Sequence, residues 1–102
     1  MQSSAGYLLR PAARADLATI WNDGAAAWGV ERADRYVDSL FVLFDLLVEF
    51  PEMARERLEF APPVRIHPSG THLVIYRLEG QSVDVIRILH AHQNLMVFLQ
   101  DG

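Results

Sequence analysis

Residues 63–92, PVRIHPSGTHLVIYRLEGQSVDVIRILHAH, decide the fold of this chain. Two turn signals, Pro68–Thr71 and Glu79–Ser82, separate runs that are rich in valine, isoleucine, leucine and tyrosine. Short runs of this composition, joined by turns that contain glycine, are typical of β-hairpins. The segment therefore predicts a three-strand antiparallel meander. We expect the remainder of the chain to cover one side of this sheet.

Symmetric closure of the two loops predicts that His67 lies opposite His72 and that Leu78 lies opposite Val83. Directly opposite residues share a face of a sheet, and neighbours along a strand alternate between faces. One face is then apolar and is predicted to be the core, with Val64, Ile66, Leu73, Ile75, Ile86 and Ile88. The other face is amphipathic and half basic, with Arg65, His67, His72, Val74, Tyr76, Val85, Arg87 and Leu89.

The same register predicts two arrangements of charged residues. Arg65, Val74 and Arg87 form one row across the three strands on the amphipathic face. Arg77 falls opposite Asp84, where opposite charges stabilise a cross-strand pair. We therefore expect Arg77 to be held in an ion pair.

Three further segments complete the predicted fold. Residues 7–9 form a strand that a proline ends. A stripe of residues at three- and four-residue spacing then predicts a helix up to Gly29, with Ala13, Leu17, Ile20, Trp21, Gly24 and Trp28. A second helix runs from about Glu31 to Phe50, and the two helices form an antiparallel hairpin over the sheet. The fold class is α+β with two layers, and the tail after His92 is expected to dock as a short helix or strand.

Val42 and Leu46 break the amphipathic pattern of the second predicted helix. They lie four residues apart on its polar side and so form a small exposed apolar pair. Isolated exposed apolar residues are normal, whereas a grouped pair also suits a surface that a partner covers. Both interpretations remain open from the residues alone.

Length and composition bound the class of protein. The 102 residues suit a single domain, residues 1–102, and 51% hydrophobic with 22% charged residues is typical of a folded globular chain. Cysteine is absent, which excludes a disulfide scaffold and a thiol nucleophile. The net charge of −4 argues against binding nucleic acid directly through its phosphates. The apolar runs are too short to span a bilayer, so we expect a cytoplasmic protein without a membrane partner.

The four histidines are the candidate metal ligands. Only His67 and His72 share the predicted face and pair, while His90 and His92 are merely near in sequence. No carboxylate completes a set of ligands. We therefore expect no metal and no cofactor.

The amphipathic sheet face carries the groups with catalytic potential: Arg65, Arg87, His67, His72 and Tyr76. Guanidinium groups stabilise anionic transition states, and histidine moves protons near neutral pH. The face could thus be an RNA-cleaving site. It could equally be a protein interface, where arginine and aromatic residues are enriched.

Five short motifs follow one another along nearly the whole chain. They are Leu9-Arg10-Pro11-Ala12-Ala13-Arg14-Ala15-Asp16-Leu17 leading to Ile20-Trp21, then Trp28-Gly29, Glu49-Phe50-Pro51-Glu52, Gly70-Thr71-His72 before Val74-Ile75-Tyr76-Arg77, and Ile86-Arg87-Ile88-Leu89-His90. Their order and spacing resemble the RelE/ParE toxin superfamily of bacterial toxin–antitoxin systems, and the ParE branch most. The resemblance implies a ParE-like toxin domain with a RelE/ParE-like fold.

The resemblance also implies a function. A ParE-like toxin binds and inhibits DNA gyrase without being an enzyme, and a cognate ParD-like antitoxin, whose C-terminal segment wraps the toxin, neutralises it. The sister branch implies an alternative, a RelE-like ribosome-dependent mRNA endoribonuclease with the catalytic residues Arg65, Arg87, His67 and Tyr76. The acidic charge and the absence of lysine favour gyrase inhibition over ribosome docking.

Two binding surfaces follow from this interpretation. The gyrase-binding residues are predicted to be Arg65, His72, Tyr76, Arg87, His90 and His92. The antitoxin is predicted to cover Val42 and Leu46. ParE-like chains tend to have Gly-Arg-x-Asp after the position of His90, whereas this chain has Ala91-His92-Gln93-Asn94. A toxin attenuated by this departure, active mainly as its antitoxin complex, is a third possibility.

Overall fold

The computed structural model describes residues 6–100. These residues form β1 (Tyr7–Leu9), α1 (Pro11–Trp28), α2 (Val30–Glu49), β2 (Glu56–Arg57), β3 (Val64–Ser69), β4 (His72–Glu79), β5 (Ser82–His90) and α3 (Leu95–Gln100). The strands make one sheet in the order β1-β5-β4-β3-β2. β1 is parallel to β5, and every other pairing is antiparallel. The predicted α+β class, the strand at residues 7–9 and the meander are therefore confirmed.

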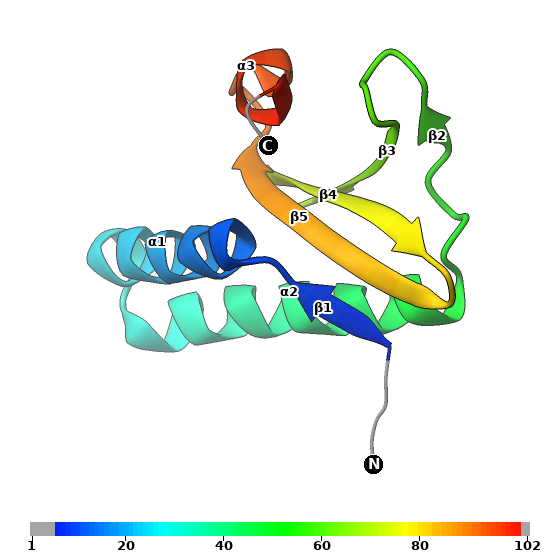
Figure 1. Ribbon diagram of the computed structural model, residues 1–102. Coiled ribbons are helices and arrows are strands. Elements are labelled where there is room, and N and C mark those ends of the chain that lie inside the picture. The colour runs from blue at the N-terminus through cyan, green and yellow to red at the C-terminus, as the bar shows by residue number, and fades with distance from the viewer. Residues whose placement is uncertain (1–5, 101–102) are drawn as a thin grey trace.

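The two long helices form the predicted antiparallel hairpin (Figure 1). Pro11 begins α1, where the missing N–H of proline costs nothing. Gly29, with φ of 98°, alone separates α1 from α2. Gly24 lies against α2, since a Cβ atom placed on it would be 3.4 Å from the Cβ of Ala33. Trp28, predicted on the buried stripe, is instead 53% exposed at the last position of α1.

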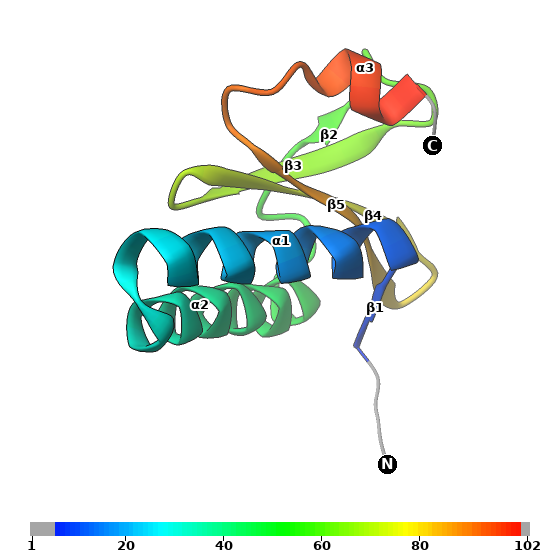
Figure 2. The same ribbon diagram turned by 90° about the vertical axis from the view of Figure 1, so that its left-hand side faces the viewer.

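The helical hairpin covers one face of the sheet and α3 covers the other (Figure 2). The main core joins the hairpin to sheet residues that the sequence had suggested were on the amphipathic face, namely Val74, Tyr76 and Val85. A smaller core under α3 contains most of the predicted apolar face, including Val64, Ile75 and Ile86. The prediction of which face the hairpin covers is therefore wrong. Arg65 lies near the start of β3 and His72 begins β4, whereas a bulge described below moves Arg87 to the other face, so the centre of the face under the hairpin is apolar.

The register of the β4–β5 hairpin is confirmed at its turn, where Leu78 pairs with Val83 and Arg77 with Asp84. The β3–β4 hairpin is wrong by two residues, since Ser69 rather than His67 pairs with His72. A shift of two leaves each side chain on its expected face.

A β-bulge changes the second half of β5. Tyr76 pairs with Val85, but the next residue of β4, Ile75, pairs with Arg87, so Ile86 is the extra residue. From Arg87 onward, each residue of β5 pairs one position away from its predicted partner, so its side chain lies on the face opposite to the predicted one. Ile88, predicted under the apolar face, consequently joins the main core with the hairpin.

The predicted Arg77–Asp84 ion pair is wrong, although the two residues are cross-strand neighbours. Asp84 is only 6% exposed and binds Arg10, whose Nε and Nη2 donate to it at 3.0 and 2.7 Å. Arg10 follows β1, which pairs with β5 beside Asp84. The sequence did not predict that β1 lies beside β5, and for this reason it did not indicate Arg10 as the partner of Asp84.

Candidate partner-binding surface

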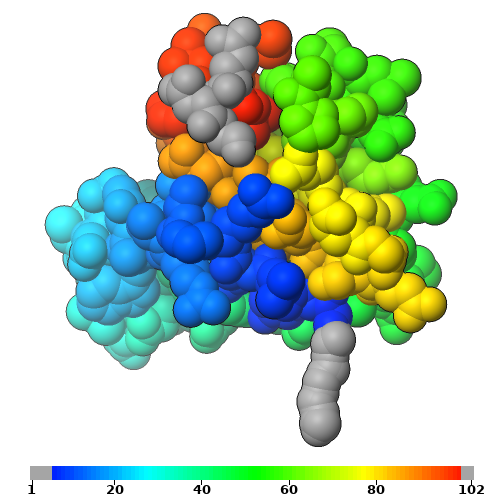
Figure 3. Space-filling model, viewed as in Figure 1, coloured from blue at the N-terminus to red at the C-terminus, as the bar shows by residue number. Residues whose placement is uncertain are grey.

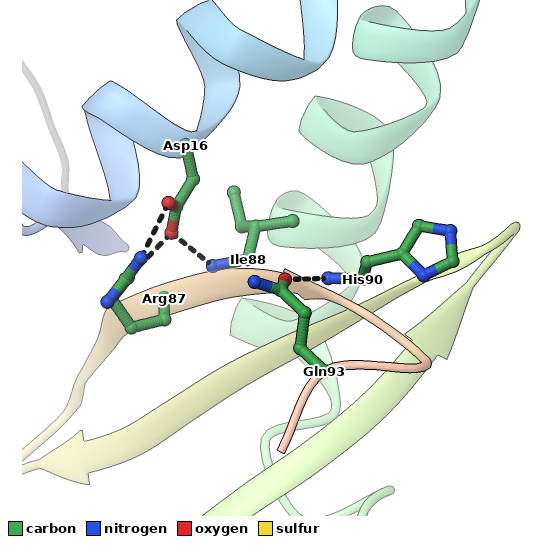
Figure 4. Close-up of polar contacts among 5 residues, drawn as sticks. All are labelled: Asp16, Arg87, Ile88, His90 and Gln93. Atoms are coloured by element: carbon green, nitrogen blue, oxygen red, sulfur yellow. Dashed lines mark hydrogen bonds and ion pairs between the residues drawn. The ribbon is translucent and has the colours of Figure 1, made fainter. Parts of the chain in front are cut away.

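Figure 4 shows how Arg87 is held at the edge of the sheet. Asp16, on α1, accepts hydrogen bonds from Arg87 Nε at 2.8 Å and Nη2 at 2.9 Å, and from the N–H of Ile88 at 2.9 Å. β1 pairs as far as Val85, and beyond it no strand of residues 6–100 lies beside this edge of β5, so the carboxylate satisfies the free N–H of Ile88. The hydrogen bond from Arg87 to Asp16 raises the pKa of this guanidinium above its ordinary value. The guanidinium also lies over the ring of Phe98, 5.3 Å from its centroid.

Three of the predicted gyrase-binding residues come together where β4 begins and β5 ends. The rings of His72 and His90 are 5.4 Å apart, and those of His90 and His92 are 5.1 Å apart. Behind them, the Oη of Tyr36 on α2 lies 2.7 Å from His72 Nδ1. Burial, and secondly the neighbouring His90, lower the pKa of His72, so its neutral form is favoured near pH 7.

Hydrogen bonds between main-chain N–H groups and side chains hold the linker after β5 in place. The side-chain oxygen of Gln93 accepts from the N–H of His90 at 2.7 Å, as Figure 4 shows. The N–H of His92 in turn donates to His90 Nδ1 at 3.2 Å. His92 is exposed and His90 half-buried, so the linker presents imidazole groups at the surface. Within residues 6–100, no three histidine or acidic side chains are placed to hold a metal ion.

Arg65 and Tyr76 do not belong to the same surface as these histidines. Tyr76 is fully buried, and its hydroxyl donates to the carbonyl of Pro51 at 2.9 Å. Burial raises the pKa of Tyr76 above its ordinary value. Arg65 Nη1 donates to the carbonyl of Ala54 at 2.7 Å. The expectation that Tyr76 lies on an open sheet face is therefore wrong, because the helical hairpin and the segment after it cover that face.

The predicted row of Arg65, Val74 and Arg87 is also wrong. Arg65 pairs with Tyr76 and so lies on the hairpin side. The bulge places Arg87 on the α3 side, above Phe98. The four residues of the ribonuclease alternative are thus divided between two faces, and His67 bonds the carbonyl of Pro68 at 2.8 Å.

Val42 and Leu46 lie on the outer side of α2, 67% and 41% exposed. Phe50 continues the row by one more turn and is 54% exposed. A shallow groove of about 380 Å³ follows at this end, between Phe50, Met53 and the residues around them. Sequence reasoning missed Phe50, which the four-residue spacing from Leu46 could have indicated. It also missed the contacts of Asp16 and Gln93, which stand in the quoted sequence segments without any sign of the partners they bind.

Helix length and hydropathy in residues 6–100 fall short of what a bilayer-spanning helix requires. The groups considered for catalysis do not converge within these residues, and the exposed apolar and imidazole side chains suit contact with another protein. Fold and surface together define a small α+β protein with exposed apolar and imidazole side chains.

Comparison with known proteins gives the family. The family model described as "ParE toxin of type II toxin-antitoxin system, parDE" matches residues 7–95. Toxin ParE1 of Mycobacterium tuberculosis is 36% identical over 93 residues, covering 90% of this chain and 95% of the relative. Toxin ParE1 of Caulobacter vibrioides is 36% identical over 93 residues, covering 91% and 96%. The chain belongs to the ParE toxin family of type II toxin–antitoxin systems.

A solved structure supports the fold independently. The chain described as "Chromosomal ParDE TA system from P. aeruginosa" superposes with a TM-score of 0.71 at 21% identity, covering 83% of this chain and 94% of the other. The predicted RelE/ParE-like fold is confirmed.

Proposed function

We propose that this chain is a non-enzymatic toxin that binds and inhibits DNA gyrase. Membership of the ParE family supports the proposal. The observation that carries the choice against a ribonuclease is the division of the would-be catalytic residues between the two sheet faces. Arg87 is bonded to Asp16, and Tyr76 is fully buried. General acid–base catalysis needs such groups within reach of one scissile bond.

The gyrase contact is proposed at the end of β5 and the linker after it, where His72, His90 and His92 gather with Arg87 at the adjoining edge. Arg65 and Tyr76 are expected to contribute only by stabilising the fold, since their side chains are bonded to the main-chain carbonyls of Ala54 and Pro51 in the segment after α2. The exposed imidazoles are the groups that a partner reaches first.

Supercoiling by purified gyrase tests this function. Wild-type toxin is expected to inhibit supercoiling, and the His90→Ala/His92→Ala double variant to inhibit it less at equal concentration. Arg35→Ala, which removes an exposed charge from α2, serves as the matched control and should inhibit like wild type. Supercoiling unaffected by a large excess of wild-type toxin would refute gyrase as the target, and cleavage of translated mRNA in primer extension would instead establish the ribonuclease.

A ParD-like antitoxin is proposed to cover the outer row of α2. Val42, Leu46 and Phe50 expose apolar surface that water solvates poorly, and a partner's apolar side chains would bury it. The double variant Val42→Asp/Leu46→Asp should weaken the complex at least tenfold, or about 1.4 kcal/mol.

The matched control places the same two charges on the exposed side of α1, as Ala18→Asp/Asn22→Asp. Both double variants are expected to fold, because the substituted side chains are exposed. Equal antitoxin affinity of the two variants, measured by calorimetry, would exclude the outer row of α2 from the interface.

A further inference from the structure

A groove opens on the sheet face opposite the helical hairpin. It has a volume of about 470 Å³ and lies between α3, the start of α1 and the loop that carries Phe60. Figure 3 shows these segments around it, with α3 in red, the loop in green and the start of α1 in blue. Its volume falls within the range of sites that take a small ligand or a few peptide side chains.

The floor and walls of the groove are mostly apolar. Phe60, Ile86, Phe98 and Leu99 line it, and Met96 at its rim is 43% exposed. The bulge in β5 contributes to this lining, because it directs both Ile86 and the following residue to the α3 side. Large apolar side chains from a partner would find complementary surface here.

Three arginines, Arg10, Arg77 and Arg87, also line the groove. Arg10 and Arg87 already have carboxylate partners in Asp84 and Asp16. The groove is therefore a local concentration of guanidinium groups on a chain whose net charge is −4.

Arg77 is the member of this set whose hydrogen bonding is incomplete. Its Nε is buried and, within residues 6–100, has no acceptor. Glu59, also in the lining, is bonded to Arg57 at 2.7 Å instead. Arg77 also lines a smaller neighbouring groove of about 210 Å³. Buried donors without acceptors are rare and costly, and a ligand carboxylate would relieve this one.

We propose that this groove binds a segment of the antitoxin in which an aspartate or glutamate neighbours a large apolar side chain. The carboxylate pairs with Arg77, and the apolar side chain lies between Phe60 and Phe98. The identity of the occupant rests on the proposed neutralisation by an antitoxin, whereas the chemistry rests on charge and apolar complementarity. The groove and the outer row of α2 lie on opposite sides of the sheet, so this partner would contact both sides of the toxin.

The chemistry is tested on the full chain with a matched pair of probes. N-acetyltryptophan carries a carboxylate, and N-acetyltryptophanamide presents the same apolar body without the charge. Titrations followed by the methyl NMR signals of Ile86 and Leu99 should show the acid binding about tenfold more tightly than the amide. Equal affinities, or no response of these methyl groups, would overturn the proposal.

Variants of groove residues test whether the preference for the acid arises in the groove. Arg77→Gln should abolish the preference for the acid, and Arg35→Gln, which removes the same charge from the exposed side of α2, should keep it. Met96→Glu places a carboxylate at the rim and gives a second measure should Arg77→Gln fail to fold; it should weaken binding of the acid and spare the amide. A preference for the acid that survives both groove variants would also overturn the proposal.

The occupant is tested with the antitoxin encoded beside the toxin. In the purified complex, the methyl groups of Ile86 and Leu99 should no longer respond to N-acetyltryptophan. A response as strong as in the free toxin would overturn the antitoxin as occupant. Failure to form any complex would refute the proposed neutralisation, while the preference for the acid is decided on the toxin alone.

Discussion

Asp16 joins α1 to the edge of β5, so we expect Asp16→Asn, which replaces one carboxylate oxygen by nitrogen, to reduce the stability of the fold strongly. The carboxylate accepts three hydrogen bonds at 2.8 to 2.9 Å, two of them from Arg87. The side chains of Asp16 and Arg87 are only 14% and 23% exposed, so water replaces little of what is lost. Hydrogen bonds to charged groups contribute about 1.5–3 kcal/mol each, and the asparagine retains one acceptor. We expect the free energy of unfolding to fall by about 2 kcal/mol, which lowers Tm by roughly 10 °C.

Chemical denaturation of the free toxin measures this loss. The control is Asp23→Asn, which removes the same charge at an exposed position of α1 and should change stability by less than about 0.5 kcal/mol. A double-mutant cycle with Arg87→Met should give a coupling energy above about 1 kcal/mol. A loss below about 0.5 kcal/mol for Asp16→Asn would refute the reasoning that this carboxylate anchors β5 to α1.

Three further predictions concern the turn, the histidines and the core. Gly70→Ala should lower the free energy of unfolding by about 2 kcal/mol, because φ is +59° and the new Cβ would lie 2.6 Å from Tyr36 Oη. Gly80→Ala, with φ of +62° and no described atom within 4 Å of the new Cβ, should lower it by about 1 kcal/mol. Equal losses for the two variants in chemical denaturation would contradict this prediction. Because the pKa of His72 is lower in the folded than in the unfolded chain, its neutral form stabilises the fold above about pH 6.5, and this contribution is lost as the pH falls. The drop in Tm between about pH 7.5 and pH 5.5 should therefore be smaller in His72→Gln than in wild type, and an equal drop would count against it. Tyr76→Phe should cost about 1 kcal/mol by leaving a buried carbonyl without its donor, and unchanged stability would argue against that hydrogen bond.

The order of elements could be predicted from the sequence because each boundary has a local cause. Pro11 begins α1, and Gly29 separates the two helices. The β4–β5 turn was located correctly because Gly80 adopts the positive φ that a two-residue hairpin loop favours.

The β3–β4 register could not be predicted by the same rule, because symmetric closure of the loop counts Pro68 as part of the turn. It is instead the penultimate residue of β3, paired with Leu73. β2 pairs with Val64 and Arg65, and no strand of residues 6–100 pairs with the outer edge of β3 at Pro68, so this position needs no N–H donor. The loop consequently closes two residues later than symmetry around residues 68–71 suggested.

The residues that reach the candidate partner-binding surface were the part of the structure that the sequence indicated least. The run Val83–Leu89 gives no sign that Ile86 is an extra residue, since apolar side chains suit either face of a sheet that is covered on both. A single added residue reverses which face each later side chain takes. Contacts between distant segments, such as Asp16 with Arg87, depend on that reversal and on the short reach of β1.

The bulge at Ile86 also supports the proposal that this chain binds protein partners rather than acting as a ribonuclease. Without it, Arg87 would share a face with Arg65 and point under the hairpin, where a second guanidinium group without a partner would be costly to bury. With it, Arg87 reaches Asp16 at the edge and Ile86 lines the groove beneath α3. Because of the extra residue, Arg87 forms an ion pair with Asp16 beside an apolar groove instead of pointing into the core. An apolar hollow bordered by guanidinium groups complements an acidic and apolar segment of another protein chain.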